Sequence, residues 1–271
     1  MTSLRRIASD FDPTIVAEID RCLRSVREDH HSKVVLAVES GSRAWGFPSP
    51  DSDYDCRFIY VRRLDDYLTL FPPRDVIEFP PDVILDVNGW DLGKALRLLL
   101  KGNAVFIEWL TSPCVYAGDE AFRNDALILA RQIVRPAGIA KHYLHLGERQ
   151  RRTYFADEHS VPIKKLFYAL RPALALRWLR LRAGQTVAPM HFPTLVAQCD
   201  LPPEIAEIID QLLRQKAVTR ELGHGAMPAP IGVLIDLEFS HARELWHAAD
   251  GKPDLESRCA ADALFRRWVR Q

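Results

Sequence analysis

Three features are missing from the sequence, and each absence excludes a class of protein. The five cysteines are scattered, and no two are spaced as a C-x-x-C pair, so neither a disulfide framework nor a zinc site is expected. No window holds the roughly 18 apolar residues that a membrane helix needs. No apolar segment follows the N-terminal MTSLRR, as a secretory signal would require. The sequence therefore predicts a cytoplasmic protein with reduced thiols and no membrane association.

An excess of charge of either sign is also missing. Lys+Arg and Asp+Glu both total 36, so the formal net charge is zero. This balance gives no indication of strong nonspecific binding to nucleic acid, although a local basic patch is compatible with it. The apolar content of 48% and charged content of 27% are ordinary for a globular protein. A chain of 271 residues can form one large domain or two modest ones.

The two parts of the chain differ in hydrophobic periodicity. Residues 1–117 mix helix and strand patterns, whereas 118–271 consist almost wholly of helical patterns. Helices are expected at 13–28, 92–101, 104–111, 118–134, 137–154, 162–181, 203–221 and 254–270, and strands at 33–38, 54–61, 76–79 and 83–87. Pro172 is expected to break or kink its helix, and 223–230 to form a loop. The pattern predicts an α+β domain followed by a helical domain, with a cleft between them.

Two acidic residues lie at the start of the expected strand 54–61. Asp53 and Asp55 are separated by one residue, which places both side chains on the same face of a strand. Carboxylates held this close repel each other unless a cation lies between them. Mg²⁺ suits this place because it prefers carboxylate oxygens together with substrate phosphates. The pair therefore predicts a magnesium site.

A third carboxylate would allow the site to hold two ions, roughly 3.5–4 Å apart. One ion would activate an attacking hydroxyl, and the other would support a leaving pyrophosphate. Asp86 has the expected hydrophobic-acid-hydrophobic context and is the preferred candidate. Asp91 is the rival, but its position directly before the helix 92–101 favours a capping role.

A glycine–serine turn precedes the acid pair by ten residues. Glycine lets the backbone approach a phosphate closely, and exposed N–H groups can bind an anion. The hydroxyl of Ser42, next to Gly41, can donate a hydrogen bond to a β- or γ-phosphate, and Arg43 can add positive charge. A phosphate cradle beside paired carboxylates is what transfer of a nucleotidyl group requires.

Longer motifs resemble those of a known family. Residues 40–42 followed by 53–55 resemble the signature of the DNA polymerase β-like nucleotidyltransferase superfamily. More narrowly, six segments look like a bacterial family of predicted nucleotidyltransferases that is associated in part with RNA ligase and RNA end repair. They are ESGSRAWGF at 39–47, SDYDCRF at 52–58, GWDL at 89–92, KGN at 101–103, EWLTSP at 108–113 and KKLFYALRP at 164–172. The resemblance covers 35–180, and the last ninety residues carry no recognised motif.

The resemblance implies a polymerase-β-like core with a mixed sheet and flanking helices, Mg²⁺ as cofactor, and an NTP donor, with ATP expected. If RNA repair applies, the acceptor is an RNA 3′ end. A small-molecule or protein hydroxyl stays open as the acceptor, as does a nucleotide-binding or regulatory module without transfer activity. No obligate protein partner is evident.

Other interpretations compete at particular residues. A calcium loop starting at Asp51 would need Gly and Glu where Cys56 and Arg62 stand, so an EF-hand is excluded, whereas a solvated acidic turn stays open. Trp45 and Phe47 can stack on a base or can anchor their loop in the core.

One helix face and one buried acid also have two interpretations. Lys164, Tyr168 and Arg171 share a face of the helix 162–181, which can bind the nucleotide or can be solvated. Glu39 is expected to support the site as a partner of Arg43 or Arg57.

Overall fold

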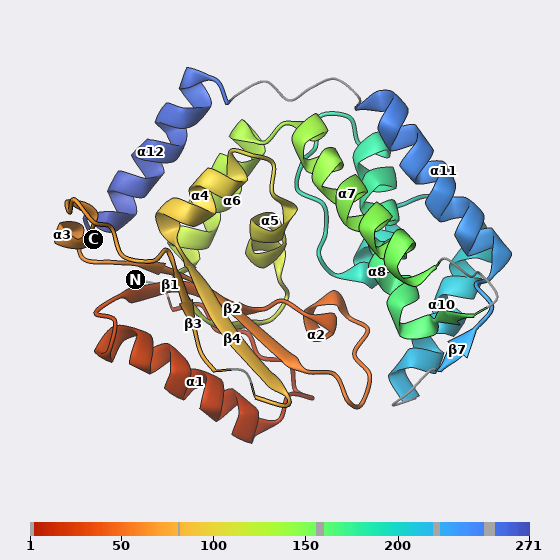
Figure 1. Ribbon diagram of the computed structural model, residues 1–271, viewed down its shortest axis with the longest axis horizontal. Coiled ribbons are helices and arrows are strands. Elements are labelled where there is room, and N and C mark those ends of the chain that lie inside the picture. Colours follow the sequence, from red (N-terminus) through yellow and green to blue (C-terminus); the bar gives the residue numbers. More distant parts are fainter. Residues whose placement is uncertain (1–2, 81, 156–159, 219–222, 247–252) are drawn as a thin grey trace.

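A five-stranded mixed sheet forms the centre of the first part of the chain (Figure 1). The computed structural model describes residues 3–80, 82–155, 160–218, 223–246 and 253–271. Its sheet has the order β3-β4-β2-β1-β5, in which β2 and β4 are parallel and the other neighbours are antiparallel. The strands are β1 (Lys33–Glu39), β2 (Tyr54–Val61), β3 (Val76–Glu78), β4 (Leu85–Asp91) and β5 (Val115–Gly118).

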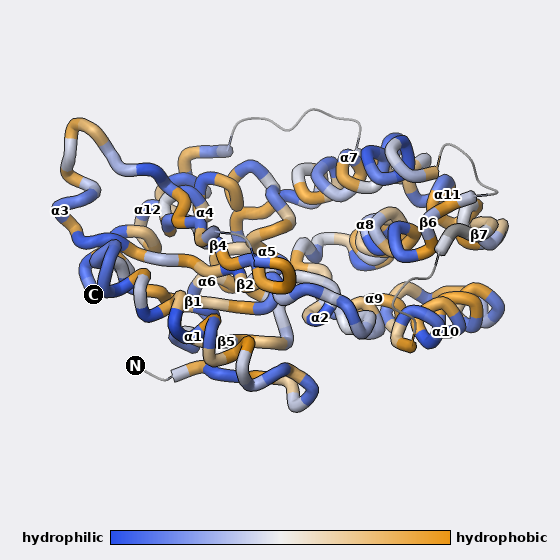
Figure 2. The backbone as a smooth tube through the Cα atoms, turned by 60° about the horizontal axis from the view of Figure 1, so that its bottom comes forward, coloured by the Kyte–Doolittle hydropathy of each residue, from blue (hydrophilic) through white to orange (hydrophobic). Residues whose placement is uncertain are grey.

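Helices cover both faces of this sheet. Helix α1 (Pro13–Glu28) begins at the cap Asp12, whose side chain accepts a hydrogen bond from the backbone N–H of Thr14. Alternate residues of a strand point to opposite sides of the sheet. The apolar stripe of α1 packs against the strand side chains that point to one of these sides. The other face is covered by three helices, with α5 wholly apolar except for one acid and the terminal threonine (Figure 2). They are α4 (Leu92–Leu99), α5 (Ala104–Thr111) and α6 (Glu120–Ile133).

A group of helices lies beside the end of the sheet that carries the short helix α2 (Ser42–Trp45) (Figure 1). Its members are α7 (Pro136–Tyr154), α8 (Ile163–Leu181), α9 (Phe192–Ala197), α10 (Pro203–Val218) and α11 (Ala229–Leu245), with a strand pair β6 (Val161–Pro162) and β7 (His224–Gly225). At Gly147 of α7, an added Cβ would lie 2.4 Å from the Phe239 ring and 3.2 Å from Pro172. The absence of a side chain there lets α7, α8 and α11 approach closely.

The last helix returns to the sheet. Helix α12 (Leu255–Val269) packs on α4 and α6, far from α11 (Figure 1). The predicted division into 1–117 and 118–271 stays a prediction, but these contacts place α6 and α12 with the sheet rather than with the other helices. A short helix, α3 (Leu64–Tyr67), follows β2. Within the described part of the chain, no helix is long and apolar enough to cross a bilayer.

The predicted α+β class is confirmed, and several predicted boundaries differ from the observed ones. Strand β4 starts two residues later than expected and continues to Asp91 through Gly89, where an added Cβ would strike the Phe58 ring. Pro172 does not break α8, whose interior is buried on nearly all sides and is held by packing. Strand β5 and the helices α9 and α11 were not predicted, and the predicted helix end at 219–221 lies outside the described residues.

Candidate functional site

The parallel pairing of β2 and β4 brings two of the predicted acids side by side. Asp55 and Asp86 are direct partners in the strand register. One guanidinium nitrogen of Arg57 lies 3.1 Å from an Asp55 carboxylate oxygen and 2.6 Å from an Asp86 carboxylate oxygen. Asp53 lies just before β2, is exposed, and lines the same cavity as Asp55. We call Asp53, Asp55 and Asp86 the carboxylate side of the site.

Charges of the same sign meet on the carboxylate side. Burial raises the pKa of Asp55 above its usual value, the Arg57 guanidinium opposes this rise, and the carboxylates of Asp86 and Asp53 add to it. Asp53 and Asp86 thus lie close enough to Asp55 to disfavour its charge, and a single guanidinium lies between Asp55 and Asp86. A bound cation would relieve the remaining repulsion.

The glycine of the Gly-Ser turn is required by close packing. A Cβ added at Gly41 would lie 1.9 Å from a carboxylate oxygen of Asp55, so any side chain at this position would displace that carboxylate. The backbone of Gly41 has an extended conformation that any residue can adopt. The approach of the turn to Asp55, rather than backbone freedom, therefore explains the glycine.

A buried acid joins the turn to the carboxylate strand. Glu39 is fully buried, and one of its carboxylate oxygens accepts hydrogen bonds from the backbone N–H groups of Gly41, at 3.1 Å, and Asp55, at 3.0 Å. The other oxygen accepts from the Tyr116 hydroxyl at 2.5 Å. Burial raises the pKa of Glu39 to about 7, although these donors favour its charged form. The prediction that Glu39 pairs with Arg43 or Arg57 is wrong, because backbone donors and Tyr116 surround it.

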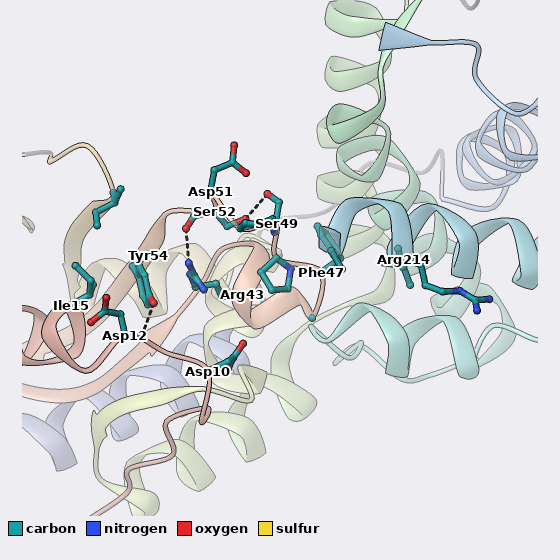
Figure 3. Close-up of a pocket in the computed structure, with 16 residues that line it drawn as sticks. Asp10, Asp12, Ile15, Arg43, Phe47, Ser49, Asp51, Ser52, Tyr54 and Arg214 are labelled. Atoms are coloured by element: carbon teal, nitrogen blue, oxygen red, sulfur yellow. Dashed lines mark hydrogen bonds between the residues drawn. The ribbon is translucent and has the colours of Figure 1, made fainter. Parts of the chain in front are cut away.

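Arg43 fixes the loop that leads into β2 instead of facing the carboxylates. Its guanidinium donates to the backbone carbonyls of Ser52, at 2.7 Å, and Asp53, at 3.2 Å, and lies 3.9 Å from the centre of the Tyr54 ring. It lines a cavity of about 740 Å³ that shares Ser49, Asp51 and Ser52 with the cavity of Asp53 and Asp55 (Figure 3). The Ser42 hydroxyl donates to the Ser52 hydroxyl at 2.9 Å, which ties the turn to the same loop.

The cavity lined by Asp53 and Asp55 is smaller, and helices α8 and α10 also contribute to its lining, whereas Asp86 does not. Its volume is about 190 Å³. Lys164 of α8 reaches the mouth and holds the Asp51 carboxylate at 2.7 and 3.0 Å. Tyr168, one turn later, also lines it, and burial raises the pKa of its hydroxyl, with Asp55 and Asp53 adding to the rise. The full lining consists of Gly41, Ser42, Trp45, Ser49, Asp51, Ser52, Asp53, Asp55, Lys164, Tyr168 and Lys216.

Lys216 is a site residue that the sequence did not reveal. It comes from α10, has only 5% of its surface exposed, and donates to the backbone carbonyl of Phe47 at 2.7 Å. Burial, together with the nearby charge of Lys164, lowers its pKa to about 8, although Asp51 opposes the shift. The segment around it is an ordinary amphipathic helix, so no local signal separates Lys216 from a surface lysine. We call Lys164, Tyr168 and Lys216 the lysine side of the site.

Comparison with known proteins decides the relationship. Residues 15–267 match the model of the RNA repair pathway DNA polymerase beta family. The chain belongs to this family. The match confirms the resemblance seen at 35–180 and extends it through α10 and α12, where no motif was recognised. Membership in the RNA repair pathway DNA polymerase beta family indicates a nucleotidyltransferase type of protein.

Two individual proteins are similar to this member of the family. An uncharacterized protein of Bacillus subtilis (strain 168), YcgL, is 39% identical over 224 residues, which is 82% of this chain and 84% of that protein. The crystal structure of a nucleotidyltransferase-like protein from Exiguobacterium sibiricum 255-15 aligns with 93% of this chain and 80% of that chain, at 12% identity. Its TM-score of 0.31 is too low to bear on the fold or the function.

Two of the remaining predicted residues, Arg171 and Asp91, do not line the cavity. Arg171 is buried, lies 2.5 Å from a Glu108 carboxylate oxygen, and places its guanidinium 4.5 Å from the centre of the Trp45 ring. Arg171 therefore packs against Trp45, which lines the cavity, but Arg171 itself does not line the cavity. Asp91 caps α4, accepting from the Gly93 N–H at 2.8 Å, as its position predicted.

Phe47 has a packing role. It is buried, stacks on Phe167 with ring centres 4.9 Å apart, and meets Phe192 edge to face. Of the two interpretations of Phe47, anchoring of the loop in the core is the observed one. The solvated-face interpretation of α8 fails at Arg171, since that side chain is buried.

The carboxylate side has the type of donor that magnesium prefers, but its side chains are not arranged as a complete metal site. Carboxylate oxygens are the hard donors that Mg²⁺ prefers. Over the described ranges, however, no three His, Cys, Asp or Glu side chains are arranged to hold a metal ion. Arg57 already pairs with Asp55 and Asp86. Because Mg²⁺ commonly uses one or two carboxylates plus substrate phosphates, the donors fit an ion that arrives with a nucleotide.

Proposed function

We propose that the protein transfers a nucleoside monophosphate from an NTP, with ATP as the expected donor, to an acceptor hydroxyl and releases pyrophosphate. One observation carries the proposal. A single cavity has the Gly41-Ser42 turn and two acids on one side and a lysine and a tyrosine of α8 on the other. Membership in the polymerase-β family supports this chemistry. A triphosphate needs positive charge and hydroxyl donors, and its reacting phosphorus needs carboxylates that can hold magnesium.

The residues of the site would divide the work. Asp53 and Asp55 would hold Mg²⁺, with two ions expected, and Asp86 would complete the ligand set or accept the proton of the acceptor hydroxyl. Bound magnesium would supply charge neutralisation at the phosphates and activation of that hydroxyl. The acceptor oxygen forms a bond to the α-phosphorus as the bond to the bridging oxygen breaks, and pyrophosphate leaves.

Other residues would position these groups. The backbone of Gly41 and the hydroxyl of Ser42 would bind the triphosphate together with Lys164 and Tyr168. Arg57 holds Asp55 and Asp86 beside each other, and Arg43 holds the loop that carries Asp53. Such fixed placement contributes to catalysis because it removes the entropic cost of bringing the groups together.

For the acceptor, we propose an RNA 3′ end. The family description names RNA repair, and this is the support for RNA over a small molecule or a protein hydroxyl. The test is to incubate the protein with each α-³²P-labelled NTP and Mg²⁺ in the presence of RNA, a small-molecule extract or protein, and to follow the label. We expect label in RNA, and label only in another fraction would replace the proposed acceptor.

Asp53→Asn tests the carboxylate side in the same assay. Loss of this acid should lower transfer by at least roughly 10²-fold, the effect of removing one electrostatic group from a preorganised site. Asp65→Asn, in the exposed helix α3, is the matched control and should keep full activity. Undiminished transfer by Asp53→Asn would refute the role of Asp53.

A second function is favoured by the contact between Arg57 and two of the acids. Because Arg57 pairs with Asp55 and Asp86, the cavity can bind a nucleotide without a metal ion, as a regulatory module would. Nucleotide binding that is independent of Mg²⁺, together with no transfer of label to any fraction, would select this function over the first.

A further inference from the structure

The lysine side holds more buried positive charge than its contacts neutralise. Asp51 pairs with Lys164 at two oxygens. Lys216 has no carboxylate partner among the described residues, and its ammonium donates to one backbone carbonyl, of Phe47. An ammonium has three donors and no acceptor, so up to two N–H groups of Lys216 are free for a ligand in the cavity that it lines.

The surroundings of Lys216 make its burial costly. Its ammonium lies 5.1 Å from the centre of the Phe47 ring, which packs against Phe167 and Phe192. This cation–π contact and the bond to the Phe47 carbonyl offset only part of the lost hydration, since burial still lowers the pKa of Lys216. Burial of the ammonium disfavours its charged form, the like charge of Lys164 disfavours it further, and the charge of Asp51 opposes both effects.

A buried cation with free donors, in a cavity that also holds Lys164 and the acids Asp51, Asp53 and Asp55, is a candidate functional group. Its donors suit the phosphates of a ligand that brings its own metal ion to the acids.

We infer that Lys216 binds the triphosphate of the nucleotide, so that α10 completes the nucleotide site. This inference rests on the proposed function and extends it to a helix without a recognised motif. A triphosphate between Lys164 and Lys216 would neutralise both cations and use the free N–H donors. Because Lys216 also donates to the carbonyl of Phe47, five residues after Ser42, the bound nucleotide would link α10 to the turn that carries Gly41 and Ser42.

The alternative is a purely structural clamp, in which Lys216 only holds the Phe47 loop against α10. The two roles differ in what a neutral side chain does. Lys216→Met removes both the charge and the hydrogen bond, whereas Lys216→Arg keeps both. Arg214→Met is the matched control, because Arg214 lies on the same helix, is exposed, pairs with Asp210 and lines the other cavity (Figure 3).

The test is calorimetric titration of the full chain with MgATP, with inorganic tripolyphosphate plus Mg²⁺, and with adenosine. We expect Lys216→Met to weaken MgATP and tripolyphosphate by roughly tenfold or more, the loss that follows when a charged hydrogen bond is removed. Adenosine binding should not change. Arg214→Met should stay within about threefold of the wild type for all three ligands, and Lys216→Arg, which keeps the charge, should lose less affinity for MgATP and tripolyphosphate than Lys216→Met.

The outcomes separate this inference from the proposed function. A wild-type protein that binds neither MgATP nor tripolyphosphate contradicts the proposed function itself. Wild-type binding that Lys216→Met leaves intact, or a loss for adenosine equal to that for tripolyphosphate, overturns the inference about Lys216 alone. If Lys216→Met does not fold, Lys216→Gln, which can still donate to a carbonyl, is measured against the same criteria.

Discussion

The two sides of the cavity are held in different ways. The carboxylate side depends on contacts close in sequence or in strand register: Asp55 opposes Asp86, and Arg57 pairs with both. The lysine side depends on helices from the second part of the chain, and Lys216 reaches a carbonyl 169 residues away. We infer that the carboxylate side determines the transfer reaction and that the lysine side determines how tightly the nucleotide binds.

The largest expected effect is on stability, at Arg171, which lies behind Trp45 and outside the cavity. Arg171→Met should lower the free energy of unfolding by about 3–5 kcal/mol, because it leaves the buried Glu108 carboxylate without its cation. Urea unfolding measures the loss. Arg267→Met, which breaks an exposed pair with Asp125, should cost less than about 1 kcal/mol. A large loss of nucleotide affinity with unchanged stability would make Arg171 a ligand-binding residue instead.

The next prediction would break the carboxylate side with one methyl group. Gly41→Ala should lower transfer by roughly 10²-fold, because the added Cβ displaces the Asp55 carboxylate. Thermal unfolding should change little. Gly184→Ala is the contrasting variant: its backbone has φ of 83° with open space around it, so stability should fall by about 1 kcal/mol while transfer is kept. Full activity of Gly41→Ala would show that Asp55 does not need its present position.

A smaller effect is expected when the guanidinium between the acids is removed. Arg57→Met should reduce transfer by roughly tenfold at low Mg²⁺ and by less at high Mg²⁺, because the metal can replace part of the lost positive charge. The pKa of Asp55 should rise, since Arg57 opposes the effect of burial, and the acid limb of the pH–rate profile should move to higher pH. Arg97→Met, at an exposed pair with Asp75, serves as control. A loss that does not depend on Mg²⁺ would contradict this explanation.

The smallest effect concerns pH on the lysine side. Burial lowers the pKa of Lys216 to about 8, below its usual value, so its charge is present at pH 7 and is lost as pH rises through 8. MgATP affinity should therefore fall roughly three- to tenfold between about pH 7 and 9.5, and Lys216→Arg should be flat over this range. The cost of burying this ammonium is fully present below pH 8, so its contribution to stability improves as pH rises above 8. Equal pH profiles of MgATP affinity for the wild type and Lys216→Arg would show that Lys216 does not cause the pH dependence.

The sequence predicted the carboxylate side because its determinants are local. The i, i+2 spacing of Asp53 and Asp55 and the preceding Gly41 lie within fifteen residues, although only Asp55 lies in strand β2 and Asp53 lies just before it. Asp86 was preferred to Asp91 on its apolar context; in the structure Asp86 pairs with Asp55 in the strand register, and Asp91 caps α4. The roles of these acids stay predictions.

The rest of the site could not be predicted for physical reasons. Arg43 and Arg171 belong to the recognised motifs, but Arg43 donates to backbone carbonyls and Arg171 pairs with the buried Glu108. No local sequence pattern indicates these partners. Lys216 reaches the cavity only through the packing of α10. Helix α11 was missed because its prolines at the start resemble a loop, although proline suits a first turn.

The most direct test of the site is to count Mn²⁺ ions by electron paramagnetic resonance in the presence of a non-hydrolysable ATP analogue. We predict that the wild type holds Mn²⁺ only when the analogue is bound, because the described acids alone form no three-ligand site. The Asp53→Asn, Asp55→Asn double variant should lose this Mn²⁺. Undiminished, nucleotide-dependent Mn²⁺ binding by that variant would contradict the assignment of the carboxylate side.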